Sequence, residues 1–429
     1  MAIVLLLGAF LILLVAGVPV ALAMLAASIL NLLYLNLFGL PLPPIVVAER
    51  VLSAINSFPL LAVPFFILAG VIMNRGGLTG HLVNVARAFV GHFHGGTAQC
   101  NVLASIFFSG ISGSASADAA AIGSMLIPTM KREGYPPGFA VGITAASATI
   151  GPIIPPSVVM IIYSAMTNLS IGALFLAGVL PGLLIGIALM VMVAFMSRRE
   201  GFPRQARQPW RERMCVLWRA IPALLAPLII VGGIVTGLYT ATEAGVVACV
   251  YGVVTGLFVY RELALRDLPG LLAEAVETTA VPVFILACAS IFGWLLTFHG
   301  FGRLVVGLFE SLALPPTAML LLLVGLLLVI GLVIEGLAAL IIFVPVFLPL
   351  IPAFGFDPIH FALIIIVTIL IGTVTPPVGL QLYIASAIGR TSLREVVIWP
   401  FVFAMVVVVV IMVLVEPVVT FLPELLMGR

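Results

Sequence analysis

One short segment of the sequence places hydroxyl, glycine and acidic residues between long apolar runs. It reads SGISGSASADAAAIG over residues 109–123 and includes the carboxylate of Asp118. Polar, non-helical backbone at membrane depth is tolerated only against protein or a water-filled cavity. Hydroxyl and carbonyl oxygens are hard ligands, so the segment is typical of a site for an alkali cation. Close helix packing through small residues is the alternative interpretation.

A second segment carries a single carboxylate in an otherwise uncharged apolar run. It reads GLVIEGLAAL over residues 331–340, with Glu335 as the acidic residue. A carboxylate in such a run is costly, so it is by default a candidate functional group. For Asp118 and Glu335 alike, the alternative is a structural carboxylate that caps a helix or pairs with a basic residue.

Two apolar spans are interrupted by glycine and a proline pair, as GPIIPPS at residues 151–157 and GTVTPPVG at residues 372–379. Proline removes a backbone donor and clashes with the preceding helical turn, so carbonyls before each pair are freed. Such carbonyls can bind a cation, and the N-terminus of the following half-helix attracts an anion. Thr373 and Thr375 add hydroxyl oxygens. A simple proline kink is the alternative.

The composition indicates what must position these segments. Of the 429 residues, 63% are hydrophobic and 8% are charged, whereas soluble domains carry about 25% charged residues. Apolar runs of roughly 20 residues, enough to cross a bilayer, recur along the whole chain. Continuous runs of this kind favour helices over the alternating strands of a barrel. The sequence therefore predicts an all-α polytopic membrane protein.

The remaining composition excludes several function classes. The net charge is +2, which gives nucleic-acid binding little support. No GxxxxGK[ST] loop is present, so we expect no ATP hydrolysis. No kinase, hydrolase or metalloprotease signature is present either, and we expect no enzymatic activity and no cofactor. The cysteines form no metal-binding or redox motif and are interpreted as isolated thiols: Cys100, Cys215, Cys249 and Cys288.

The most basic loop divides the chain into two halves. It covers residues 198–219 and is predicted to be cytoplasmic by the positive-inside rule. The halves are then residues 1–197 and 220–429. We expect five full spans in each half, plus one segment that enters and leaves on the same face. An odd number of spans would invert the second half relative to the first.

Matched motifs support an internal duplication. VPFFILAG at Val63–Gly70 resembles VPVFILAC at Val281–Cys288, and Asp118 and Glu335 each lie ten residues before a proline. Both proline pairs follow a glycine by four residues. Three matches in the same order predict two inverted repeats. The predicted hairpins cover about 96–133 and 316–352, and the predicted broken helices cover about 137–166 and 359–388.

With these motifs the chain resembles the large membrane subunit of TRAP (tripartite ATP-independent periplasmic) transporters. The resemblance rests on VPFFILAGVIMNRGG, SGSASADAAAIGSMLIPTMKREGYPPGFA, GPIIPPS and GTVTPPVGLQLYIASAIG, and it covers nearly the whole chain. It implies the ion-transporter superfamily, with a scaffold that includes most of residues 1–57 and a mobile elevator-type transport domain.

The resemblance also implies a function and partners. It implies sodium-coupled uptake of a small carboxylate, such as a C4-dicarboxylate or sialic acid, across the bacterial inner membrane. A periplasmic binding protein would deliver the solute, and a small membrane subunit would be a separate chain. Where Glu335 and Gly336 stand, the family commonly has an aspartate followed by a hydroxyl residue.

Carried over position by position, the resemblance implies three groups of site residues. The first sodium site would comprise Ser109, Gly110, Ser114, Asp118, Thr149, Gly151 and Pro152. The second sodium site would comprise Gly331, Glu335, Gly336, Gly372, Thr373 and Thr375. The substrate site would comprise Ser112, Ser116, Pro156, Ser157, Pro377 and Val378.

Two other functions remain open on the residues alone. One is a self-sufficient transporter of the sodium/dicarboxylate or arsenite kind, which would need no binding protein. The other is a membrane scaffold or receptor that moves no solute and in which Asp118 and Glu335 serve only stability.

Overall fold

The computed structural model describes residues 1–38, 42–43 and 45–428, and the regular structure of these residues is helical. The first half contains α1 (Ala2–Val15), α2 (Val20–Leu37), α3 (Ile45–Ile55), α4 (Ala62–Arg75), α5 (Leu78–Val90), α6 (Gly96–Ser112), α7 (Ala115–Arg132), α8 (Pro137–Ala148), α9 (Val158–Thr167) and α10 (Ile171–Glu200). A 3-10 turn, η1 (Phe58–Leu61), leads directly into α4.

The second half provides another set of helices after the basic loop. It contains α11 (Trp210–Val235), α12 (Ala241–Val254), α13 (Leu268–Phe298), α14 (Phe301–Ser311), α15 (Pro316–Gly331), α16 (Gly336–Phe347), α17 (Leu350–Phe354), α18 (Pro358–Gly372), α19 (Leu380–Gly389), α20 (Trp399–Leu414) and α21 (Pro417–Met427).

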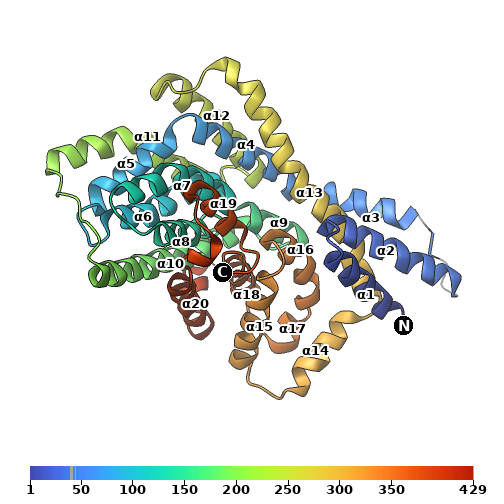
Figure 1. Cartoon of the computed structure of the whole chain (residues 1–429). Coiled ribbons are helices and arrows are strands. Elements are labelled where there is room, and N and C mark those ends of the chain that lie inside the picture. The colour runs from blue at the N-terminus through green and yellow to red at the C-terminus, as the bar shows by residue number, and fades with distance from the viewer. Residues whose placement is uncertain (39–41, 44, 429) are drawn as a thin grey trace.

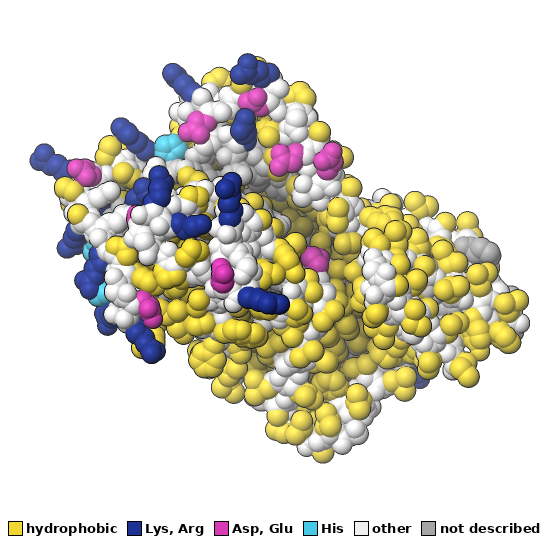
Figure 2. Space-filling view, in the orientation of Figure 1, with side chains coloured by type: hydrophobic (Ala, Val, Ile, Leu, Met, Phe, Trp, Pro, Cys, Tyr) yellow, Lys and Arg dark blue, Asp and Glu magenta, His cyan; other side chains and the backbone are white. Residues whose placement is uncertain are grey.

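The described residues include six helices that are long and apolar enough to cross a membrane. A seventh span results if α20 and α21, which meet at a bend of 61°, are taken as one. Much of the surface is apolar, and Lys and Arg side chains gather along the left and upper edges of the view in Figure 2. These features confirm the predicted all-α polytopic membrane protein.

Four short helix pairs surround the segments that the sequence marks as candidate sites. Only Gly113 and Ser114 separate α6 from α7, and residues 332–335 separate α15 from α16. Longer non-helical stretches, residues 149–157 and 373–379, separate α8 from α9 and α18 from α19. The polar segment at residues 109–123 is therefore more helical than its composition suggests, because the chain turns over two residues.

The loop between the halves is shorter than the basic segment suggested. α10 continues to Glu200 and α11 begins at Trp210, so only residues 201–209 are non-helical. The arginines of this region therefore lie largely on the ends of two helices. Three amphipathic helices, α3, α5 and α14, were not anticipated, since each is shorter than a span.

The helices form a central group flanked by an extended arm. In Figure 1, the long α13 runs diagonally from the upper part of the molecule to α1, α2 and α3. α13 contacts α2, α3 and α4, and α4 also packs against α12. In the central group the halves interlock, because α19 packs against α7 and α8, and α16 packs against α9.

A buried polar network joins α6 to α8. Asn101 Nδ2 donates a hydrogen bond to Thr144 Oγ1 at 2.6 Å, and Ser147 Oγ donates to Asn101 Oδ1 at 2.9 Å. Ser105 Oγ donates to Ser147 Oγ at 3.0 Å. Asn101 and Ser147 are fully buried. The network therefore fixes the first helix pair against the helix that precedes the first break.

We predict that Asn101→Ala lowers the free energy of unfolding in mixed micelles by about 0.6–2 kcal/mol, the range for hydrogen bonds between membrane helices. Ser124→Ala is the matched control, because Ser124 is exposed and bonds only the carbonyl of Ala121. Equal stability of the two variants would show that the network contributes nothing.

Candidate functional site

Asp118 lies in the first turn of α7, against the first helix break. Its side chain is 1% exposed, and Oδ1 accepts a hydrogen bond from Ser112 Oγ. Oδ2 is buried and has no hydrogen-bond partner. A Cβ on Gly151 would collide with this oxygen. The free carboxylate oxygen therefore faces the non-helical backbone between α8 and α9.

The turn between α6 and α7, called the first tip, packs its backbone directly against the backbone of the break between α8 and α9. Gly113 has a φ of +59°, and a Cβ there would lie 2.6 Å from the carbonyl oxygen of Pro156. Ser157 caps α9, since its Oγ accepts from Met160 N at 3.2 Å while it donates to Pro152 O at 2.5 Å. Glycine is required at this contact because no side chain fits.

The second half repeats this close approach with different residues. A Cβ on Gly331 would lie 2.6 Å from Cα of Gly372, and one on Gly336 would lie 2.8 Å from Cγ2 of Thr373. The amide of Val378 donates to the carbonyl of Leu332 at 3.3 Å. The tip between α15 and α16 is thus held directly against the break between α18 and α19.

Glu335 differs from Asp118 in its surroundings. Glu335 is exposed and caps α16, with its oxygens accepting from Leu337 N at 3.1 Å and Ala338 N at 3.0 Å. A carboxylate is stabilised at this position by the free amides and the dipole of the helix. The structure thus shows the capping role that the sequence left as an alternative, and each oxygen retains lone pairs.

The other proposed cation ligands lie around the two breaks and keep acceptor capacity. Four hydroxyl groups donate to carbonyls three or four residues earlier, which leaves oxygen lone pairs free: Ser109, Thr149, Thr373 and Thr375. Gly110 packs against the ring of Pro227, on a helix outside the proposed site. Ser114 Oγ lies 3.1 Å from Ser116 Oγ.

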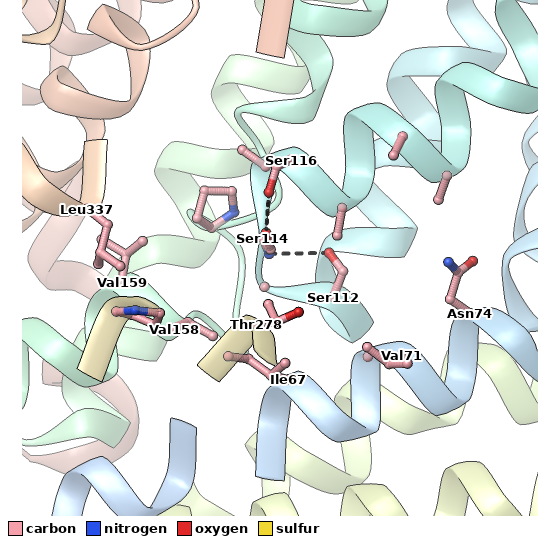
Figure 3. Close-up of a pocket in the computed structure, with 18 of the residues that line it drawn as sticks. Ile67, Val71, Asn74, Ser112, Ser114, Ser116, Val158, Val159, Thr278 and Leu337 are labelled. Atoms are coloured by element: carbon pink, nitrogen blue, oxygen red, sulfur yellow. Dashed lines mark hydrogen bonds between the residues drawn. The ribbon is translucent and has the colours of Figure 1, made fainter. Parts of the chain in front are cut away.

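A cavity of about 910 Å³ lies where the two tips and two breaks meet. Gly113 and Gly336 line it from the tips, and Pro152 and Thr373 line it from the breaks. Figure 3 shows Ser112, Ser114 and Ser116 together at its centre, with Ile67, Val71 and Asn74 of α4 along one side. Its volume suits a small organic solute.

The residues predicted to bind substrate divide into two groups. Ser112 and Ser116 line the cavity. Pro156 and Ser157 are buried in the first break. The described lining of the cavity includes none of the four remaining residues: Pro156, Ser157, Pro377 and Val378. The half-helices that follow the breaks reach the cavity through Val158, Val159, Leu380 and Gln381.

Several lining residues were missed because they belong to other helices. α4 contributes Asn74 and Arg75, and α13 contributes Glu274 and Thr278. The repeated VPxFILA motif, which lies near the start of α4 and in the middle of α13, is the sequence feature that links these two helices. Gln381 also lines the cavity, is 5% exposed, and has a buried Oε1 without a hydrogen-bond partner.

The ligands available at the breaks differ from those of a transition-metal site. Among the described residues, no group of three or more His, Cys, Asp or Glu side chains could hold a metal ion. The donors that converge are hydroxyls, carbonyls and single carboxylates, which suit a hard cation.

The comparisons with known proteins agree with this architecture. Residues 7–418 match the family described as tripartite ATP-independent periplasmic transporter, DctM component. The chain belongs to the TRAP large permease family. The predicted resemblance is confirmed, and the protein is a membrane transporter subunit rather than an enzyme.

Two relatives of this TRAP permease align over most of its length. It is 39% identical to the sialic acid TRAP transporter large permease SiaM of Vibrio cholerae, covering 97% of both chains. It is 41% identical to the C4-dicarboxylate TRAP large permease DctM of Pseudomonas aeruginosa, covering 80% of both. The MtrF structure of Neisseria gonorrhoeae shares the fold, with a TM-score of 0.61, 14% identity and coverage of 88% of this chain and 85% of MtrF.

We predict that Gly331→Ala destabilises the TRAP permease by about 1–3 kcal/mol, the usual cost of overpacking. The added methyl group would separate α15 from Gly372, whereas Gly325, on the same helix, has no heavy atom within 4 Å of a Cβ. Gly325→Ala should therefore be neutral or slightly stabilising. Thermal unfolding in detergent measures both, and equal midpoints would contradict the close contact.

Proposed function

We propose that the chain is the translocating subunit of a sodium-coupled importer for small organic acids. The observation that supports this most directly is the buried, unpartnered Oδ2 of Asp118 beside the first helix break. An unpaired carboxylate oxygen buried at membrane depth is costly. A sodium ion held by Asp118 and the neighbouring hydroxyl and carbonyl oxygens would compensate it.

The second sodium site is proposed at the corresponding break of the second half. Thr373 and Thr375 supply hydroxyl oxygens there, and Gly331 and Gly372 bring two backbones together. Glu335 already accepts two amide hydrogen bonds. It would therefore contribute charge to this site more weakly than Asp118 contributes to the first.

The cavity between the tips is the proposed site for the solute. Its three serines are small polar partners for a carboxylate. α7 begins beside the cavity without a side-chain cap on its first amides, which attract anions. Gln381 supplies an unpartnered oxygen that could accept a bond from a substrate hydroxyl. The names of the two relatives support sialic acid, a C4-dicarboxylate or a similar acid as the solute.

The proposed transport movement takes place between the two walls of the cavity. α4 and α13 form one wall of the cavity, and the tips and breaks form the other. If the two halves are inverted repeats, the tips and breaks would move as one elevator-type body against a scaffold containing α1, α2, α4 and α13. The interlocking of α19 with α7 and α8 supports a single moving unit.

The proposed partners follow from the family to which the chain belongs. A tripartite periplasmic transporter requires two further components, which we take to be a small membrane subunit and a periplasmic binding protein. The bacterial inner membrane is the proposed location, with the arginine-rich helix ends on its cytoplasmic side.

Proteoliposomes test the coupling ion and the partners together. We predict that uptake of a labelled organic acid requires an inward sodium gradient, the binding protein and the small subunit. A potassium gradient of equal size serves as the control for ionic strength and membrane potential. Undiminished uptake without sodium would disprove the coupling ion, and undiminished uptake without the binding protein would favour the self-sufficient transporter.

The role of Asp118 has its own test. We predict that Asp118→Asn raises the sodium concentration for half-maximal uptake at least about tenfold, equivalent to about 1.4 kcal/mol of binding free energy. Glu335→Gln should have a smaller effect, because its carboxylate caps α16. Glu310→Gln, at an exposed position of α14, is the control. Unchanged sodium dependence in Asp118→Asn would remove this residue from the site.

A further inference from the structure

A second cavity lies away from the transport site, between α5 and the first turns of α11. Its volume is about 240 Å³, and polar and basic side chains form most of its lining. The lining residues are His81, Asn84, Arg87, Gln208, Val216 and Arg219. No element of the proposed transport mechanism uses these residues.

Polar atoms in and beside this cavity lack partners. Arg87 Nε and Gln208 Oε1 are buried without a hydrogen bond. Arg213, which precedes the lining residue Val216 by one helical turn, is 5% exposed, and its Nε and Nη2 also have no partner. A buried guanidinium without compensation is strongly unfavourable. Of these two arginines only Arg87 lines the cavity, and its unsatisfied N–H calls for an acceptor that carries negative charge there.

The charge of the cavity comes from its arginines. His81 stacks on Tyr260 with ring centroids 4.2 Å apart. Burial lowers the pKa of His81, Glu262 raises it and Arg219 lowers it, with a net decrease from the usual 6.5. The lowered pKa disfavours a charge on His81, and the positive charge of the lining is carried by Arg87 and Arg219. This combination selects an anion.

Flanking tryptophans place the cavity at the level of lipid headgroups. Trp210 and Trp218, on the same part of α11, are 65% and 76% exposed. Tryptophan is enriched where membrane and water meet, and basic residues are enriched on the cytoplasmic side. α11 carries exposed Arg211 and Arg219 in this region. The cavity thus lies where a phospholipid of the cytoplasmic leaflet presents its phosphate.

We propose that this cavity binds the phosphate of an anionic phospholipid headgroup from the cytoplasmic leaflet. Basic pockets between helices on the cytoplasmic side are suited to such headgroups. Arg87 and Arg219 bind the phosphate from α5 and α11 respectively, and Asn84 adds a neutral donor. The lipid therefore ties α5, which connects α4 to α6, to the helix that begins the second half.

Ligand-dependent stability of the purified full-length chain tests the proposal. Thermal unfolding in detergent is followed during titration with dioctanoyl phosphatidylglycerol, dioctanoyl phosphatidylcholine or inorganic phosphate. We expect phosphatidylglycerol to raise the midpoint saturably, with little effect of the other two at equal concentration. Arg87→Gln and Arg219→Gln should each raise the half-saturating concentration about fivefold.

Arg211→Gln is the matched control, because Arg211 is exposed on the same helix and does not line the cavity. If Arg87→Gln fails to fold, Arg219→Gln decides the outcome, since Arg219 is exposed in the described structure. Equal responses of Arg219→Gln and Arg211→Gln to phosphatidylglycerol would overturn the proposal. An equal stabilisation by inorganic phosphate would also overturn it, because the site would then bind a free anion.

Discussion

The structure depends on sheltering non-helical backbone from lipid. In a bilayer, every backbone group that leaves a helix needs protein or water around it. The break between α8 and α9 and the break between α18 and α19 each lie against the turn of a neighbouring helix pair. The two backbones approach so closely that only glycine fits at the contact. Gly331 faces Gly372 in one half, and Gly113 faces the carbonyl of Pro156 in the other. The oxygens freed by each break consequently stay concentrated at one place in each half.

The two halves use this constraint with unequal chemistry. Asp118 is buried and retains an oxygen without a partner, whereas Glu335 is exposed and satisfies both oxygens on the amides of α16. The difference follows from position, because Glu335 is the N-cap of α16 whereas Asp118 lies inside the first turn of α7. The polar network of Asn101, Thr144 and Ser147 reinforces the first half, while Thr368 has a buried hydroxyl without a partner. Of the two carboxylates, only the one beside the first break therefore keeps a buried oxygen without a hydrogen-bond partner.

Local sequence was sufficient to locate the helix breaks, because glycine and proline act on the backbone of their own segment. Gly151 to Ser157 and Gly372 to Gly379 accordingly lie in or border non-helical stretches. The cavity wall formed by α4 and α13 could not be predicted from local sequence, because Asn74 and Thr278 reach the cavity only through the packing of these two helices. The amphipathic helix α5 was likewise missed, because its 13 residues form no apolar run. The sequence also could not show that Glu335 caps α16, because the same sequence context suits a carboxylate that binds a cation.

Ser112 provides a physical connection between the proposed ion and solute sites. Its hydroxyl donates to Oδ1 of Asp118 and accepts from the amide of Ser114 at 3.4 Å. Ser112 and Ser114 both line the cavity. A cation at Asp118 would draw on the same carboxylate that orients this hydroxyl, and so would change the position of the tip against the solute. With both proposed sites occupied, the ion and the solute would bias the same two-residue turn, which is the differential contact that coupling between two sites requires.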